Sequence, residues 1–105
     1  MSVSDVEGTS DRALALLWRV AQEAVRNAIR HGEPATLSVV VTGDENLVFL
    51  DVADDGRGFD TDQPRPDRHF GLRGLGSLVG DAGGRLVVRS APGDGTVLHL
   101  EVSKQ

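Results

Sequence analysis

Asp54-Asp55-Gly56-Arg57-Gly58 is a glycine-rich stretch that predicts a sharp turn directly after a strand expected over residues 47–53. Apolar residues occupy every second position of this strand from Val48 to Val52, and Asp54 continues the same row towards the expected helix layer. A carboxylate that points inward needs a hydrogen-bond donor, because burying an unpaired polar group costs about 1–3 kcal/mol. We therefore expect a binding site at the end of this strand.

A long amphipathic helix is predicted over residues 11–31, and Gly32 ends it. Its expected apolar stripe consists of Leu14, Leu17, Val20, Ala21, Ala24 and Ala28. At about 100° per residue, Glu23 and Asn27 lie one turn apart at the border of this stripe, and His31 points the same way. Polar side chains in that position need partners. This row is therefore expected to form one edge of the site.

The rest of the chain alternates between strands, a loop and one more helix. The predicted elements are strands over residues 35–42, 85–90 and 96–103 and a helix over residues 72–82. Residues 60–70 contain two prolines and have no periodicity, which indicates a loop. This order predicts an α+β fold: a two-layer sandwich with a mixed, mostly antiparallel sheet and helices on one face.

The composition excludes several classes of protein. A length of 105 residues suits one domain, and we expect residues 1–9 to be a loose leader before a domain at residues 10–105. The absence of cysteine excludes disulfides and thiolate metal sites and fits a reducing compartment. The net charge of −5 and the lack of a basic face argue against nucleic acid as a partner. No apolar run is long enough to span a bilayer, and no signal peptide pattern is visible. We expect a cytoplasmic location, although a parent protein could be membrane-anchored.

Four motifs in this order resemble the N, G1, G2 and G3 boxes of the GHKL ATPases, which share the Bergerat fold. They are Glu23-x-x-x-Asn27, Asp54-x-Gly56-x-Gly58, Gly71-Leu72-x-Gly74-Leu75 and Gly93-x-Gly95-Thr96. Within this superfamily, Arg19-Val20-Ala21-Gln22-Glu23-Ala24 and Phe70-Gly71-Leu72-Arg73-Gly74-Leu75 are similar to bacterial sensor histidine kinases of the nitrate-sensor type. The resemblance covers about residues 14–102.

The resemblance implies an ATP site with magnesium. Asn27 would hold the magnesium ion that bridges the phosphates. Asp54 would accept a hydrogen bond from the adenine amino group, which selects ATP over GTP, and Thr96 would support Asp54 and the base. Backbone amides at Gly71 and Gly74 would face the phosphates, next to a flexible ATP lid over about residues 60–72. The nucleotide-binding positions implied are Asn27, Arg30, His31, Asp54, Gly56, Gly58, Gly71, Leu72, Gly74, Leu75 and Thr96.

Some of these residues also have plainer structural interpretations. Glu23 is the implied catalytic base, but its spacing equally allows an ion pair with Arg19 or Arg26. Asn27 could cap a neighbouring backbone group. Gly93-Asp94-Gly95 makes a good hairpin turn without any ligand.

The expected function is that of a catalytic domain. A sensor kinase phosphorylates a histidine on a separate dimerising helix, and none of His31, His69 and His99 lies on such a helix. We therefore expect a monomeric domain that binds Mg-ATP, acts on the dimerisation and phosphoacceptor domain of a parent kinase, and serves a response regulator indirectly. His69 and His99 receive no role, and Trp18 is expected in the core or at an interface.

Two other interpretations stay open. A serine kinase of the anti-sigma-factor type has the same fold and needs no dimerisation helix. A degenerate nucleotide-binding docking module is the non-enzymatic alternative. The intact Asn27, Asp54 and motif glycines argue against it. Gly76-Ser77-Leu78, which replaces the polar, often charged stretch that the family has after Gly74-Leu75, leaves room for it. The strand that often precedes the long helix in this family is missing here or reduced to residues 3–8.

Overall fold

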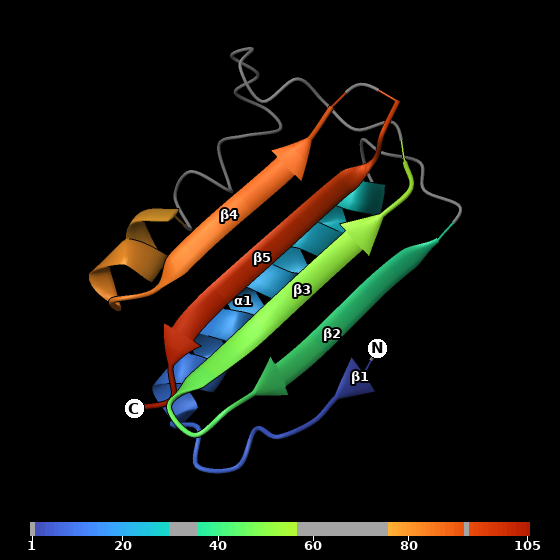
Figure 1. Cartoon of the computed structure of the whole chain (residues 1–105). Coiled ribbons are helices and arrows are strands. Elements are labelled where there is room, and N and C mark those ends of the chain that lie inside the picture. The colour runs from blue at the N-terminus through green and yellow to red at the C-terminus, as the bar shows by residue number, and fades with distance from the viewer. Residues whose placement is uncertain (1, 30–35, 57–75, 92) are drawn as a thin grey trace.

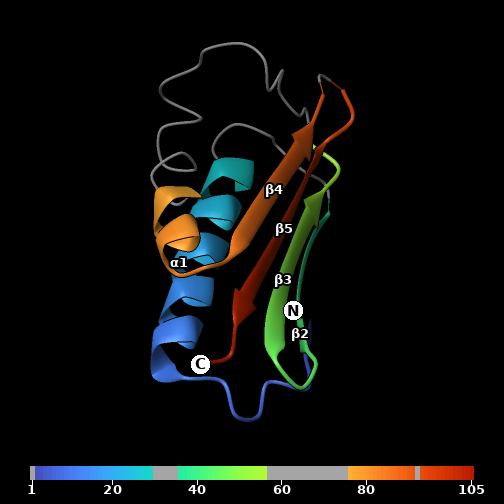
Figure 2. The same cartoon turned by 60° about the vertical axis from the view of Figure 1, so that its left-hand side comes forward.

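The computed structural model describes residues 2–29, 36–56, 76–91 and 93–105. Five strands form one sheet in the order β1-β2-β3-β5-β4. They are β1 Ser2–Val3, β2 Leu37–Gly43, β3 Leu47–Asp54, β4 Arg85–Ser90 and β5 Thr96–Ser103. β1 runs parallel to β2, and all other neighbours are antiparallel. Helix α1, Asp11–Asn27, and a helical segment over residues 76–81 lie on the same face of the sheet (Figures 1 and 2). The α+β prediction is confirmed.

Helix α1 begins where the sequence predicts. The Ser10 side chain accepts a hydrogen bond from the backbone N–H of Ala13 at 3.1 Å, which caps the first turn. Asp11 in the first turn and Arg26 in the last complement the helix dipole. Among the described residues, no helix is long and apolar enough to cross a membrane.

The face of α1 that packs on the sheet differs by a fraction of a turn from the predicted stripe. Its buried residues are Ala13, Leu17, Val20 and Ala24. Leu14, expected in the stripe, is 41% exposed, because Ala13 takes the inward position in the first turn. Trp18 follows Leu14 on the outer side of the helix and is 62% exposed, so it lies outside the core of this domain.

The core lies between α1 and the two central strands. Every second residue of β3 and of β5 points towards the helices, as the alternation of the sequence predicts. The largest fully buried side chains are Val20, Val48, Leu50, Val79, Leu98 and Leu100. Burying an aliphatic side chain of this kind stabilises a fold by about 1.5–3 kcal/mol. This packing fixes the position of β3, which ends beside the predicted site, and of β5, which begins there.

The second predicted helix is described only from residue 76 onwards. Residues 76–81 are helical, and the backbone N–H of Gly84 closes the end by donating to the Val79 carbonyl at 2.8 Å. Val79 anchors this segment in the core, since it is 1% exposed. Residues 72–75 of the predicted helix lie outside the described residues.

The N-terminal residues are tied to the sheet, whereas we expected a loose leader. Ser4 donates its backbone N–H to the Val41 carbonyl at 2.9 Å and so continues the pairing of β1 with β2. The ammonium group of Lys104 donates to the carbonyls of Asp5 and Glu7 at 3.0 Å each, and Lys104 is only 8% exposed. Residues 2–9 are therefore part of the folded unit.

Candidate functional site

Asp54 and Thr96 lie directly opposite each other at the end of the β3–β5 ladder. Asp54 shares the row of Val52, and Thr96 shares the row of Leu98, so both side chains are on the face that the helices cover. Figure 1 shows this end of the two strands next to the C-terminal end of α1, where Asn27 lies. The structure thus brings three of the predicted site residues to one end of the molecule.

The Asp54 carboxylate has the donor that its inward position requires. Oδ1 accepts a hydrogen bond from the backbone N–H of Gly56 at 2.8 Å, which closes the turn after β3. The next residue, Asp55, fastens the turn to the other side of the hairpin, because its Oδ1 accepts from the backbone N–H of Thr36 at 2.8 Å. The turn therefore holds Asp54 in one orientation at the sheet end.

Gly95 fits closely against the backbone of Asp54. Its φ is +73°, and a Cβ atom at this position would lie 2.1 Å from the Asp54 carbonyl oxygen. Only glycine combines that backbone angle with that approach. Gly95 is thus required by the way β5 starts beside Asp54, whether or not a ligand is bound.

Ser90 is a functional candidate that no sequence motif identifies. It lies opposite Thr96 in the β4–β5 ladder. Its hydroxyl donates to the Gly95 carbonyl at 2.8 Å and lies 2.9 Å from the Thr96 hydroxyl. One signal was available in the sequence: Ser90 continues the alternating row of Leu86 and Val88, which points towards the core.

Glu23 and Asn27 lie at the border of the buried face of α1, as predicted, and both are half-buried. Glu23 Oε2 is 3.9 Å from Arg26 Nη1, which is the structural pairing that helical spacing allows. Because the Arg26 side chain is 62% exposed, this ion pair is weak. It leaves the Glu23 carboxylate available for a second role.

Asn27 is the last residue of α1, and the chain continues as a wider π turn over residues 28–29. Such turns are frequent at functional sites. A magnesium ion on ATP is held mainly by phosphate oxygens and waters, so one neutral amide oxygen fits the protein share of its coordination. In the described ranges, no group of three or more His, Cys, Asp or Glu residues could hold a metal ion.

The remaining predicted site residues lie outside the described residues. They are Arg30, His31, Gly58, Gly71, Leu72, Gly74 and Leu75, together with the predicted lid over residues 60–72. Their roles stay predictions.

His99 lies on the other face of the sheet and has close partners there. Its Nδ1 is 2.5 Å from Asp51 Oδ1, and its Nε2 is 3.1 Å from Glu101 Oε1. The ring also stacks on Phe49 with 6.0 Å between centroids. The hydrogen bond to Asp51 is the main cause that raises the pKa of His99 above its ordinary 6.5, against the opposing effect of partial burial. These contacts are structural, and they lie away from Asp54 and Thr96.

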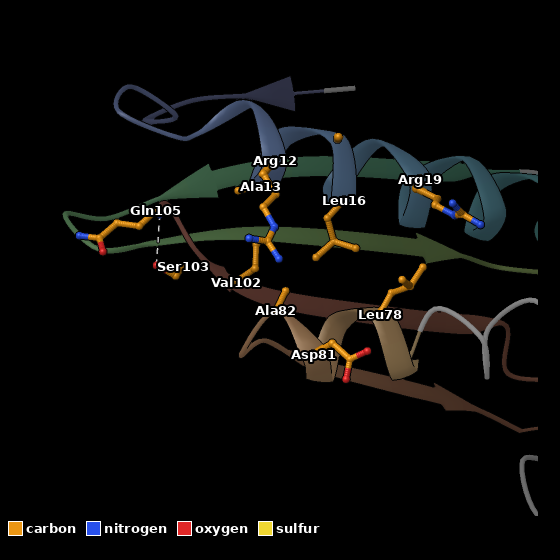
Figure 3. Close-up of a pocket in the computed structure, with 11 residues that line it drawn as sticks. Arg12, Ala13, Leu16, Arg19, Leu78, Asp81, Ala82, Val102, Ser103 and Gln105 are labelled. Carbon is orange, nitrogen blue, oxygen red and sulfur yellow. Dashed lines mark hydrogen bonds between the residues drawn. The ribbon is translucent and has the colours of Figure 1, made fainter.

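A separate groove lies near the other end of α1, between this helix, the helical segment over residues 76–81 and the end of β5 (Figure 3). Its volume is about 570 Å³. It is lined by Arg12, Ala13, Ala15, Leu16, Arg19, Leu78, Asp81, Ala82, Val102, Ser103 and Gln105. Arg12 and Asn27 are about 22 Å apart along α1 at 1.5 Å per residue. None of the predicted site residues that the structure describes lines this groove.

The arrangement just described agrees with a known family of ATPases. Residues 13–105 match the family described as "Histidine kinase-, DNA gyrase B-, and HSP90-like ATPase". The chain belongs to this family. Its fold and the order of its glycine motifs are therefore those of an ATP-binding domain.

Curated relatives of the chain are sensor kinases. One is the signal transduction histidine-protein kinase/phosphatase DegS of Bacillus subtilis, which is 35% identical over 90% of this chain and 26% of its own length. Another is the sensor histidine kinase LiaS of the same organism, which is 31% identical over 82% of this chain and 24% of its own length. The chain thus spans about a quarter of the length of these relatives.

Solved structures agree on the fold. The histidine kinase domain of the Erythrobacter litoralis EL346 blue-light activated histidine kinase superposes with a TM-score of 0.70 at 23% identity, over 96% of this chain and 52% of that chain. The Acinetobacter baumannii histidine kinase AdeS gives 0.68 at 18% identity, over 87% and 47% of the two chains. The predictions of this fold and of a histidine kinase catalytic ATPase domain are confirmed.

Proposed function

We propose that this domain binds Mg-ATP at the end of the sheet formed by Asp54 and Thr96 and transfers the γ-phosphoryl group to a histidine on a separate domain of a sensor kinase. The observation that carries the proposal is the cross-strand pair of Asp54 and Thr96 on the helix-covered face, beside the end of α1. A carboxylate, a hydroxyl and an amide side chain thus lie at one end of a domain whose order of motifs belongs to an ATPase family.

The base would be recognised by Asp54. Its Oδ1 is oriented by the N–H of Gly56, and the carboxylate can accept from the exocyclic amino group of adenine. Gly56 and Gly58 would let the backbone pass close to the ring, and Thr96 would add a second polar contact. A guanine base carries a carbonyl where adenine has its amino group, so it would meet the carboxylate with repulsion.

The phosphates would lie towards the end of α1. Asn27 would contribute one amide oxygen to magnesium, which, when bound, neutralises charge on the phosphate oxygens. We assign phosphate contacts to the backbone amides of Gly71 and Gly74 and to the side chains of Arg30 and His31, and nucleotide contacts to Leu72 and Leu75 of the same motif. These assignments rest on the family motifs.

In the transfer, the imidazole nitrogen of the acceptor attacks the γ-phosphorus. A P–N bond forms, the P–O bond to the β-phosphate breaks, and ADP leaves. The attacking nitrogen uses its lone pair, so the proton to be removed is on the other ring nitrogen. Glu23 would accept that proton, because its carboxylate is half-buried one turn before Asn27 and, among the described residues, has only the weak contact with Arg26. Most of the rate would come from positioning and charge neutralisation.

The relatives support a sensor kinase of the nitrate-sensor type over a serine kinase. DegS and LiaS are both histidine kinases by name, and a further relative is the sensor protein VraS of Staphylococcus epidermidis, at 27% identity over 81% of this chain. A parent kinase of this type would supply the dimerisation and phosphoacceptor domain, and a response regulator would then receive the phosphoryl group.

Calorimetric titration with ATP, ADP and GTP, each with magnesium, tests the nucleotide site directly. We expect ATP and ADP to bind and GTP not to bind. A second step mixes the domain and labelled ATP with Bacillus subtilis DegS whose own ATP site has been inactivated. Label on DegS that is lost in acid and kept in alkali identifies phosphohistidine, whereas acid-stable label would favour the serine kinase. A folded domain that binds none of the nucleotides would favour the docking module.

A further inference from the structure

Three side chains form a row across three neighbouring strands at the predicted base site. Asp54 of β3 is opposite Thr96 of β5, and Thr96 is opposite Ser90 of β4. All three follow the inward-facing rows of their strands and are half-buried. Cβ atoms of side chains directly opposite each other are about 4.5–5.5 Å apart. Ser90, the outer member of the row, therefore neighbours Thr96 and is two strands away from Asp54.

The direction of the hydrogen bonds in this row follows from counting protons. The Ser90 hydroxyl lies 2.8 Å from the Gly95 carbonyl, which can only accept, so Ser90 uses its one proton there. The contact between the Ser90 and Thr96 hydroxyls, at 2.9 Å, then needs its proton from Thr96. The Thr96 proton thus points away from Asp54, towards β4.

This arrangement leaves only acceptors on the side of the row that faces Asp54. The Thr96 oxygen keeps a lone pair for a ligand, and the Asp54 carboxylate is itself an acceptor. In the part of the chain that the structure describes, the Thr96 side chain has no other hydrogen bond than that with Ser90. A ligand group, or a bridging water, must therefore donate to this pair.

We propose that Ser90 is a positioning residue that fixes Thr96 as an acceptor and so makes the site prefer a purine with an amino group over one with a carbonyl at the same ring position. The inference rests on the proposed ATP site. Without the Ser90 oxygen, the Thr96 hydroxyl is free to rotate and to donate to a carbonyl, because no other residue that the structure describes accepts its proton.

ATP and ITP are suitable probes, because ATP carries an amino group and ITP a carbonyl at the same ring carbon. The measurement is the ratio of their dissociation constants with magnesium, for wild type, Ser90→Ala and Ser90→Thr. We expect wild type to prefer ATP and Ser90→Ala to reduce this preference about fivefold, because the loss of one neutral hydrogen bond changes a dissociation constant by about that factor. Ser90→Thr keeps the hydroxyl and should restore the preference. Ser103→Ala removes a hydroxyl from the far end of β5 and is the matched control.

The ratio separates positioning from a merely structural role. Loss of the Ser90–Gly95 bond could loosen the turn, but this would weaken ATP and ITP equally and leave the ratio unchanged, which would overturn the inference. If Ser90→Ala does not fold, Thr96→Val replaces it, and a ratio equal to that of wild type would again overturn the inference. A wild-type domain that binds neither nucleotide would instead refute the proposed ATP site.

Discussion

Asp54 and Thr96 face each other across the last rung of the β3–β5 ladder, on the side of the sheet that α1 covers. Asn at position 54 can still accept from the N–H of Gly56, so Asp54→Asn should fold like wild type. It loses the charge that strengthens a hydrogen bond to the base, and ATP affinity should fall about tenfold to a hundredfold. Calorimetry measures the affinity.

The matched control for this change is on the same strand. Asp51→Asn makes the same substitution three positions earlier, on the opposite face of β3, where Asp51 contacts His99. We expect ATP affinity to stay at the wild-type value. Equal losses in the two variants would mean that net charge, not the position of Asp54, determines binding.

Asn27→Ala should change the dependence of binding on magnesium. If the Asn27 amide contributes to the metal, ATP affinity with magnesium should fall about tenfold or more, while affinity in EDTA should match that of wild type. Titrations under both conditions measure this. Gln22→Ala removes an exposed amide from the same helix as a control. A loss of equal size in EDTA would indicate that Asn27 only supports the fold.

Gly95→Ala and Gly93→Ala separate backbone strain from close contact. Both glycines have positive φ, +73° and +85°, so alanine at either position costs about 1–3 kcal/mol in strain. A Cβ atom at Gly93 meets nothing within 4 Å, whereas one at Gly95 would lie 2.1 Å from the Asp54 carbonyl. Urea unfolding should show the larger loss for Gly95→Ala, and only this variant should also lose ATP affinity. Equal effects would contradict the role of the close approach.

His99 should make stability depend on pH. Its pKa is raised in the folded state above the ordinary 6.5, mainly by Asp51, so its contribution is complete below about pH 6.5 and is lost as the pH rises through the higher folded pKa. Since the side chain is 34% exposed, the contribution should be below about 1 kcal/mol. The difference in unfolding free energy between wild type and His99→Gln should be larger at pH 6 than at pH 9. A difference independent of pH would contradict this.

The regular elements could be predicted because their signals are local. The predicted strands over residues 85–90 and 96–103 match β4 and β5, since alternating Val and Leu residues encode a half-buried strand directly. β1 has only two residues and exists because it pairs with β2, far away in the sequence, so no local pattern reveals it.

Site residues that carry a family motif could be predicted from the sequence. Residues whose contacts form only when strands pair could not be predicted. Asp54 and Thr96 belong to the motifs, and the register of β3 and β5 brings them together. Ser90 acquires its contacts only when β4 pairs with β5, and His99 meets Asp51 only when β5 pairs with β3. The prediction that Leu14 is buried is wrong, because helical periodicity defines the buried face only approximately. Ala13 packs against the sheet instead.

A titration of the domain with Mg-ATP, followed residue by residue in a two-dimensional amide NMR spectrum, tests the position of the nucleotide site directly. We predict that the signals of Asp54, Gly56 and Thr96 shift together with one dissociation constant, while those of Arg12 and Gln105, at the groove near the other end of α1, stay unchanged. Shifts confined to the groove, with Asp54 and Thr96 unaffected, would contradict the assignment of the nucleotide site.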